Sequence, residues 1–204
     1  MIGVAIFSYN RPKMLVEAIK SCKGADEIVV MDDGSDMQEQ IMEIAQEHGG
    51  VMRLTPVPVE YSEQWEALRV LRNECREFFT NDTALITESG QAAYMARCAT
   101  RPGLRHYLFY YKGIPVGFCR LSHEGVWVIP TYGLHPEFRG KGLGRKLIAM
   151  TYLMAGGPIR GSRLVTNSGV RAIDESLGAR TTSVSGGVEY WECPWPPPFV
   201  EGLL

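Results

Sequence analysis

The sequence predicts an α/β protein, and three features of its pattern lead to that expectation. The first fifty residues alternate strand, helix, strand and helix, which is the repeat of an open α/β sheet. Three strand patterns then follow one another between residues 106 and 134, as in a meander. A glycine-rich turn after the last strand leads directly into a helical pattern at 143–155. We therefore expect an α/β domain preceded by a small βαβα segment.

The N-terminal segment begins with an apolar run at residues 2–8, which predicts a buried strand. Pro12 follows, and its ring suits the first turn of a helix. The apolar stripe of that helix consists of Met14, Leu15, Ala18 and Ile19. Residues 27–31 predict a second buried strand, closed by the turn DDGS at 32–35. A further helical face precedes the glycines at 49–50 and consists of Ile41, Ile44 and Ala45.

The pattern changes after residue 50. A strand at 51–57, interrupted by prolines, precedes a long helix at 62–79 and a second helix at 89–98, for which Thr87 is a suitable N-cap. The three strands of the meander are expected at 106–111, 116–121 and 126–134.

The remaining elements follow the glycine-rich turn. They are a helix at 143–155, a strand at 163–166, a short helix at 170–177 and a strand at 188–193. The proline-rich tail at 194–204 should be extended. No internal repeat is visible.

Composition limits the function classes. The chain has 204 residues, of which 45% are hydrophobic and 22% charged, so it can form one medium globular domain with an appendage. Its net charge of -2 does not indicate nucleic-acid binding, although a local basic patch is compatible with it. No apolar run approaches 18 residues, so we expect no membrane span.

The five cysteines, Cys22, Cys75, Cys98, Cys119 and Cys193, are scattered and have no histidine at ligand spacing. We therefore expect neither a disulfide framework nor a metal site, and a cytoplasmic location.

The segment from Tyr132 to Lys146, YGLHPEFRGKGLGRK, carries the chemistry. It places a strand, a turn with three glycines and a helix in line. The unpaired N–H groups of the first helical turn converge there, and the helix dipole adds to them. Basic side chains surround the turn: Arg139, Lys141, Arg145 and Lys146. This is an anion site that a diphosphate would fit.

The same segment resembles the acetyl-CoA signature of the GNAT N-acetyltransferase superfamily, an R/Q-x-x-G-x-G/A turn. Arg139, Gly142 and Gly144 match the signature, and Gly140, Lys141 and Leu143 lie between them. The resemblance extends over residues 53–193 in the order of elements. It implies the GNAT fold, a mixed and mostly antiparallel central sheet flanked by helices, with acetyl-CoA as co-substrate.

The resemblance also implies a set of cofactor contacts. The strand before the turn should splay from the next strand, and the pantetheine arm should lie in the gap beside Tyr132, Gly133 and Leu134. Asn167 matches an asparagine that family members often place near the cofactor, although an N-cap of the following helix explains it equally well. The complete expected set is Leu134, His135, Arg139, Gly140, Lys141, Gly142, Leu143, Gly144, Arg145 and Asn167.

The catalytic groups are harder to assign. Many GNAT members have a tyrosine in the helix after the last cofactor strand as the acid for the leaving thiolate, whereas this chain has none there and its spacing is shorter. Ser176 is a poor acid, so the thiolate leaves unassisted or Tyr132 or Tyr190 serves. Candidates for a base are Tyr132, His135, Glu124 and Glu137. We select Tyr132 as the catalytic residue, with its role as acid or base left open. Cys119 is a weak nucleophile candidate.

Residues 4–36 resemble the opening of a GT-A glycosyltransferase, in which N-R-P and D-D-G-S turns shape a nucleotide-sugar pocket. The resemblance makes Asp32 or Asp33 the carboxylate for uracil or ribose; a plain tight turn is the alternative. No D-x-D metal motif fits before the acyltransferase pattern begins. We therefore predict three parts: a truncated segment at 1–52, an acetyltransferase domain at 53–193 and the tail at 194–204.

The predicted function is transfer of acetyl from acetyl-CoA to a primary amine of a small molecule, such as an amino sugar or a nucleotide-linked amine. One alternative is modification of a nucleobase amine in DNA. Another is a CoA-binding or nucleotide-binding regulatory module without turnover, and a third is a glycosyltransferase remnant that serves as a docking domain. The oligomeric state is left open.

Overall fold

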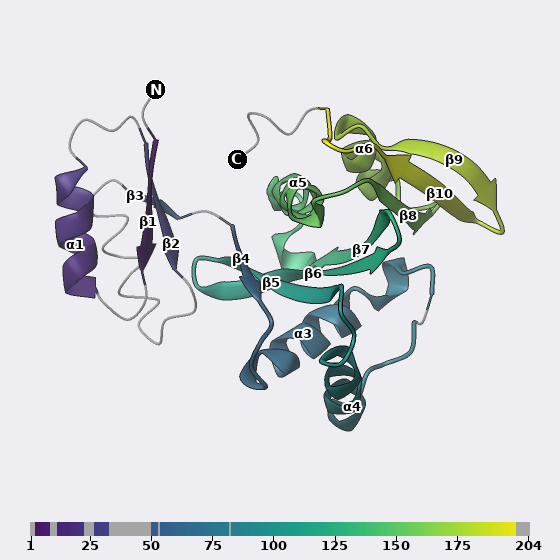
Figure 1. The fold of residues 1–204 in the computed structure, drawn as a ribbon, viewed down its shortest axis with the longest axis horizontal. Coiled ribbons are helices and arrows are strands. Elements are labelled where there is room, and N and C mark those ends of the chain that lie inside the picture. The colour runs from purple at the N-terminus through teal and green to yellow at the C-terminus, as the bar shows by residue number, and fades with distance from the viewer. Residues whose placement is uncertain are drawn as a thin grey trace. The chain divides into compact units, whose positions relative to one another are not determined.

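The computed structural model describes residues 3–8, 12–22, 27–32, 50–52, 54–81 and 83–198 (Figure 1). The chain divides into two compact units, Met1–Val57 with Phe109–Pro115, and Pro58–Leu108 with Val116–Leu204. In the described part of the chain, no helix is long and apolar enough to cross a membrane.

The N-terminal sheet has three strands in the order β1-β2-β3: β1 (Gly3–Ser8), β2 (Glu27–Asp32) and β3 (Gly50–Met52). Both pairs are parallel. Helix α1 (Pro12–Ser21) connects β1 to β2 and begins at the proline, as predicted. Leu15 and Ile19 of its apolar stripe are buried, whereas Met14 is exposed. The predicted helix containing Ile41, Ile44 and Ala45 lies outside the described residues.

The larger sheet has seven strands in the order β4-β5-β6-β7-β8-β10-β9. The first four strands are β4 (Thr55–Pro58), β5 (Leu104–Tyr111), β6 (Ile114–Glu124) and β7 (Trp127–Leu134). The other three are β8 (Ile159–Leu164), β9 (Arg180–Ser185) and β10 (Val188–Cys193). β6 pairs antiparallel with β7, and β10 pairs antiparallel with both β8 and β9. β7 and β8 pair in parallel. The predicted mixed, mostly antiparallel sheet is therefore confirmed.

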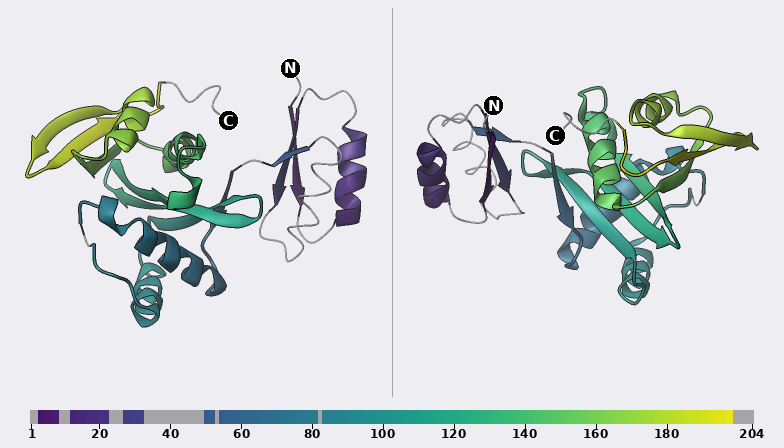
Figure 2. Two further views of the ribbon diagram at one scale, coloured as in Figure 1. Left: turned by 180° about the vertical axis from the view of Figure 1, so that it is seen from behind. Right: turned by 45° about the horizontal axis from the view of Figure 1, so that its top comes forward.

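Helices cover both faces of this sheet. They are α3 (Glu63–Glu74), α4 (Glu88–Cys98), α5 (Leu143–Ala155) and α6 (Ser168–Ser176), with short 3-10 turns η1 (Arg76–Phe78) and η2 (Pro136–Phe138). The views of Figures 1 and 2 agree that α3 and α4 lie on the face opposite α5. Helix α5 fills its face with fully buried side chains, including Leu147 and Tyr152.

Several element boundaries differ from the prediction, and one strand was missed. The long helix expected at 62–79 ends as α3 at Glu74, because the chain then tightens into the 3-10 turn η1, in which the Phe78 N–H donates to the Cys75 carbonyl at 3.1 Å. The strand expected at 163–166 lies earlier, as β8. Strand β9 was not predicted, because its side chains are exposed throughout and show no apolar alternation.

Candidate active site

Strands β7 and β8 diverge from a common point. They pair in parallel at Val128 and Ile159, and the Val128 N–H donates to the carbonyl of Pro158 at 2.9 Å. β7 then continues beside β6 as far as Leu134, whereas β8 pairs with β10. This divergence is the splay that the resemblance to the GNAT superfamily implies.

A cavity of about 940 Å³ opens where the two strands separate. All six β7 residues from Ile129 to Leu134 line it, and so do Ser162 and Arg163 of β8. Successive strand residues face opposite sides of a sheet. A Cβ on Gly133 would meet Cys75 after α3, whereas the Leu134 side chain lies beside Gly117 and Leu147 of α5. The cavity therefore reaches both faces of the sheet.

The glycine turn forms one wall of this cavity. Gly140 and Gly142 have φ values of 74° and 77°, in the left-handed region that favours glycine, and Gly142 is the N-cap of α5. A Cβ at either position would meet nothing within 4 Å, so the backbone conformation is what requires these glycines. The chain thereby enters α5 with the N–H groups of its first turn free of intrahelical partners.

Basic side chains surround the turn but are partly engaged by the protein. The Arg139 Nε donates to the carbonyl of Leu134 at 3.1 Å, and its guanidinium lies 4.5 Å from the Phe78 ring centroid. Arg145 donates to the Ser176 hydroxyl at 2.7 Å. Arg139 therefore connects the glycine turn to the end of β7 and holds Leu134 close to the N-terminus of α5.

Most of the predicted cofactor residues meet at the cavity. Those that line it are Leu134, Arg139, Gly140, Gly142, Gly144, Arg145 and Asn167. His135, Lys141 and Leu143 do not line it. Leu143 is buried in the core, so in the first turn of α5 it can offer a ligand its backbone N–H.

Asn167 caps α6, where its Oδ1 accepts from the Val170 N–H at 3.3 Å. It also lines the cavity. The N-cap reading is therefore confirmed, and the same side chain is placed where it could face a ligand.

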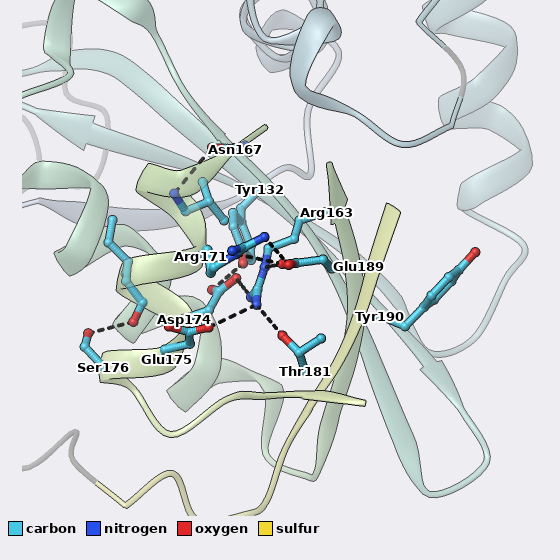
Figure 3. A network of polar contacts seen from close by, with 12 residues as sticks. Tyr132, Arg163, Asn167, Arg171, Asp174, Glu175, Ser176, Thr181, Glu189 and Tyr190 are labelled. Carbon is cyan, nitrogen blue, oxygen red and sulfur yellow. Dashed lines mark hydrogen bonds and ion pairs between the residues drawn. The ribbon is translucent and has the colours of Figure 1, made fainter. Parts of the chain in front are cut away.

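Tyr132 lies in a buried polar network (Figure 3). Its hydroxyl donates to Asp174 Oδ1 at 2.7 Å, and the Tyr152 hydroxyl donates to the same oxygen at 3.0 Å. Arg163 donates to the other carboxylate oxygen at 3.0 Å. Burial raises the pKa of Asp174 to about 6, against the opposing effect of these three donors. Burial and the neighbouring Asp174 raise the pKa of Tyr132 well above 10, so its hydroxyl keeps its proton at neutral pH.

Arg163 connects this carboxylate to a second one. Its Nε donates to Glu189 Oε2 at 2.8 Å, and Arg171 pairs with Glu189 from the other side. The Arg163 side chain is 3% exposed, so each buried charge of the cluster has a counter-charge. Asp174 is not among the residues predicted from the sequence. The signal that could have identified it is a carboxylate on the apolar stripe of α6, next to Ile173 and Leu177.

The other catalytic candidates lie apart from the cavity. His135 accepts from the Glu137 N–H through Nδ1, and exposed Glu124 forms an ion pair with Arg160 at 3.6 Å. Burial raises the pKa of Cys119 to about 12, which keeps it a thiol. Tyr190 is 47% exposed and points away from the network in Figure 3.

The remaining predicted site is in the N-terminal unit. Asp32 is the last residue of β2, and Asp33 lies outside the described residues. Among the described residues, no group of three or more His, Cys, Asp or Glu side chains could hold a metal ion.

Two family models match the chain. The model of the acetyltransferase (GNAT) family matches residues 65–155, which run from α3 through the glycine turn to the end of α5. The model of glycosyl transferase family 2 matches residues 3–76, in agreement with the glycosyltransferase-like start. The two matches overlap in α3, which packs against α4 and β7. No curated protein matches the sequence. 

Several solved structures similar to this chain are acetyltransferases. Spermidine N-acetyltransferase from Vibrio cholerae, in complex with CoA and spermine, has a TM-score of 0.62 and 14% identity over 71% of this chain and 96% of its own. A GNAT superfamily phosphinothricin acetyltransferase from Sinorhizobium meliloti, in complex with acetyl-CoA, has a TM-score of 0.55 and 15% identity over 69% and 88%. A GNAT family acetyltransferase from Streptococcus pneumoniae has a TM-score of 0.54 and 12% identity over 69% and 97%. The larger unit of this chain has the GNAT fold.

Proposed function

We propose that residues 53–193 form an acetyltransferase domain that transfers acetyl from acetyl-CoA to a primary amine of a small molecule. The observation that carries this proposal is the cavity between β7 and β8, which meets the glycine turn and reaches both faces of the sheet. Two substrates can then meet in the gap, each entering from its own face.

The cofactor half of the cavity is the side of the glycine turn. The N–H groups at the start of α5 and the guanidinium groups of Arg139 and Arg145 suit the pyrophosphate of CoA. The pantetheine arm would follow the strand backbone at Leu134. Similar solved structures that contain CoA or acetyl-CoA support this assignment of the ligand.

The reaction joins the amine nitrogen to the acetyl carbon and breaks the carbon–sulfur bond of the thioester. A primary amine with an ordinary pKa near 10.4 must first lose a proton, which costs about 5 kcal/mol at pH 7. After the amine attacks, its nitrogen still has one proton to lose and the departing thiolate needs one. We assign both transfers to Tyr132: its hydroxyl protonates the thiolate and then takes up the proton from the nitrogen. Asp174 holds that hydroxyl in place.

For the N-terminal residues 1–52 we propose a truncated glycosyltransferase-like segment, kept for packing, nucleotide contact or partner binding. The glycosyl transferase family 2 match supports its origin. This assignment does not enter the acetyl-transfer proposal.

The test of the proposed function is thiol release from acetyl-CoA in the presence of a panel of primary amines. Amine-dependent release supports the acetyltransferase, and its rate should fall about a hundredfold in Tyr132→Phe. If acetyl-CoA binds but no amine stimulates release, the regulatory module without turnover is the better account.

A further inference from the structure

The charged side chains that line the cavity are all basic. They are Arg72, Arg97, Arg120, Arg139, Arg145 and Arg163. Within the described residues, no aspartate or glutamate lines the cavity. His106 also lines it, and burial together with nearby Arg120 lowers its pKa to about 4, so it is neutral at pH 7. An anionic ligand in the cavity would therefore meet only cationic and neutral side chains at the wall.

Three of these arginines are accounted for by an ion pair or by the proposed cofactor site. Arg163 is neutralised by Asp174 and Glu189. Arg139 and Arg145 lie at the glycine turn, where the proposed function places the CoA pyrophosphate. Arg72, Arg97 and Arg120 remain, and nothing in the proposed cofactor arrangement uses them.

The remaining arginines lie on the opposite side of the sheet from α5. Arg72 is on α3 and Arg97 is on α4, the two helices that cover that face (Figure 1). Arg120 of β6 lies opposite Thr131 of β7. The preceding residue, Cys119, faces α5, where its side chain is within hydrogen-bonding reach of Thr151. Because neighbouring strand residues face opposite sides, Arg120 faces α3 and α4.

The same half of the cavity contains buried donors that lack acceptors. The Arg120 Nη2 donates to the Thr131 hydroxyl at 3.0 Å, but in the described part of the chain its buried Nε has no hydrogen-bond partner. Gln91 of α4 is 3% exposed, and its buried Nε2 also lacks a partner there. Buried donors without acceptors are costly, and a carboxylate or phosphate offers several acceptor oxygens.

We propose that the acceptor amine carries an anionic group, a carboxylate or a phosphate, which binds between Arg120, Gln91 and the arginines of α3 and α4. This inference rests on the proposed acetyltransferase function and names its substrate class. The opposite substrate type, a polyamine such as the spermine of the Vibrio cholerae complex, offers only cations, which these guanidinium groups repel.

Binding of matched probes to the CoA-saturated protein tests the proposal. One pair is β-alanine and β-alaninamide, which differ in the carboxylate, and the other is phosphoethanolamine and ethanolamine, which differ in the phosphate; spermidine is the cationic probe. We expect calorimetry to give roughly tenfold or tighter binding of the anionic member in at least one pair. The pair that shows the preference identifies carboxylate or phosphate as the group. Equal affinity in both pairs, including no detectable binding of either member, or tighter binding of spermidine, overturns the proposal.

Substitution of arginines inside and outside the cavity distinguishes binding at this site from a general effect of the protein's charge. Arg120→Gln and Arg97→Gln should lower the affinity of the preferred anionic probe roughly ten- to hundredfold, with the neutral probe unchanged. Arg105→Gln removes the same charge from an exposed residue of β5 that does not line the cavity, and should change neither. CoA affinity is measured on every variant. If Arg120→Gln weakens CoA binding instead of probe binding, the arginines serve the cofactor and the acceptor proposal is wrong. If the wild type itself does not bind CoA, the acetyltransferase proposal fails first.

Discussion

The hydroxyl of Tyr132 has a strong acceptor in the carboxylate of Asp174, and this pairing determines what the tyrosine can do. A phenol whose pKa is raised by burial and by a neighbouring carboxylate keeps its proton at neutral pH. It is therefore suited to donate a proton to a thiolate. It is poorly suited to serve as the resting base, because it would have to be deprotonated beside Asp174.

Removal of this hydroxyl tests its role. Tyr132→Phe should lower kcat about a hundredfold, since one positioned proton donor typically contributes on that order. The KM for acetyl-CoA should change little, because the ring remains in place. Steady-state kinetics measures both quantities, and Tyr190→Phe, at an exposed tyrosine that does not line the cavity, is the matched control. A kcat equal to that of the wild type would remove Tyr132 from the mechanism.

Sequence reasoning located Tyr132 because the residue belongs to a recognisable segment, YGLHPEFRGKGLGRK. Asp174 and Arg163 were not predicted. The apolar stripe of α6 could have marked Asp174 as a buried carboxylate, but its pairing with Arg163 depends on a contact between α6 and β8 that no local pattern encodes. A buried ion pair of this kind becomes visible only when the fold places both partners beside each other.

The elements differ in how strongly local sequence specifies them. Helix α5 has the predicted bounds, because Gly142 starts it and Gly156 ends it, both in the left-handed conformation. Helix α4 begins after Thr87, whose hydroxyl accepts from the Gly90 N–H as predicted. Strand β9 has no apolar face, yet the glycines at 186 and 187, with φ values of 57° and 79°, form a two-residue hairpin turn. This Gly-Gly pair is the sequence feature from which a hairpin, and so β9, could have been predicted.

Asn167 caps helix α6 and also lines the cavity. Asn167→Ala should lower the free energy of unfolding by about 1 kcal/mol through loss of the cap, whereas Asn167→Ser should retain the cap and the stability. If the amide also contacts acetyl-CoA, both variants weaken its binding several-fold. Urea unfolding and calorimetry on the two variants separate the roles, and unchanged binding in Asn167→Ser would leave Asn167 as a cap alone.

At the scale of the whole molecule, two buried groups give opposite pH dependences of stability. The pKa of Asp174 is raised from 3.8 to about 6, so the folded state holds that proton more tightly and stability is lost as pH rises through this interval. The pKa of His106 is lowered from 6.5 to about 4, so stability is gained as pH rises through nearly the same interval. In the wild type the two contributions largely oppose each other.

Single variants should expose each contribution. Relative to the wild type, Asp174→Asn should gain stability as pH rises from about 4 to about 6, and His106→Gln should lose it, each with a slope of up to about 1.4 kcal/mol per pH unit. Urea unfolding at a series of pH values measures both differences. Parallel curves for a variant and the wild type would show that its group does not titrate with the shifted pKa.

The central claim is that the glycine turn at the start of α5 binds acetyl-CoA, and calorimetric titration of acetyl-CoA tests it most directly. Gly142→Ala and Gly156→Ala are matched variants: each replaces a left-handed glycine at an end of α5, and in each case the added Cβ would meet nothing within 4 Å. Both should cost about 1–2 kcal/mol of stability. We expect the wild type and Gly156→Ala to bind acetyl-CoA alike and Gly142→Ala to bind it at least tenfold more weakly. Equal affinities for all three proteins, or no binding by the wild type, would contradict the account.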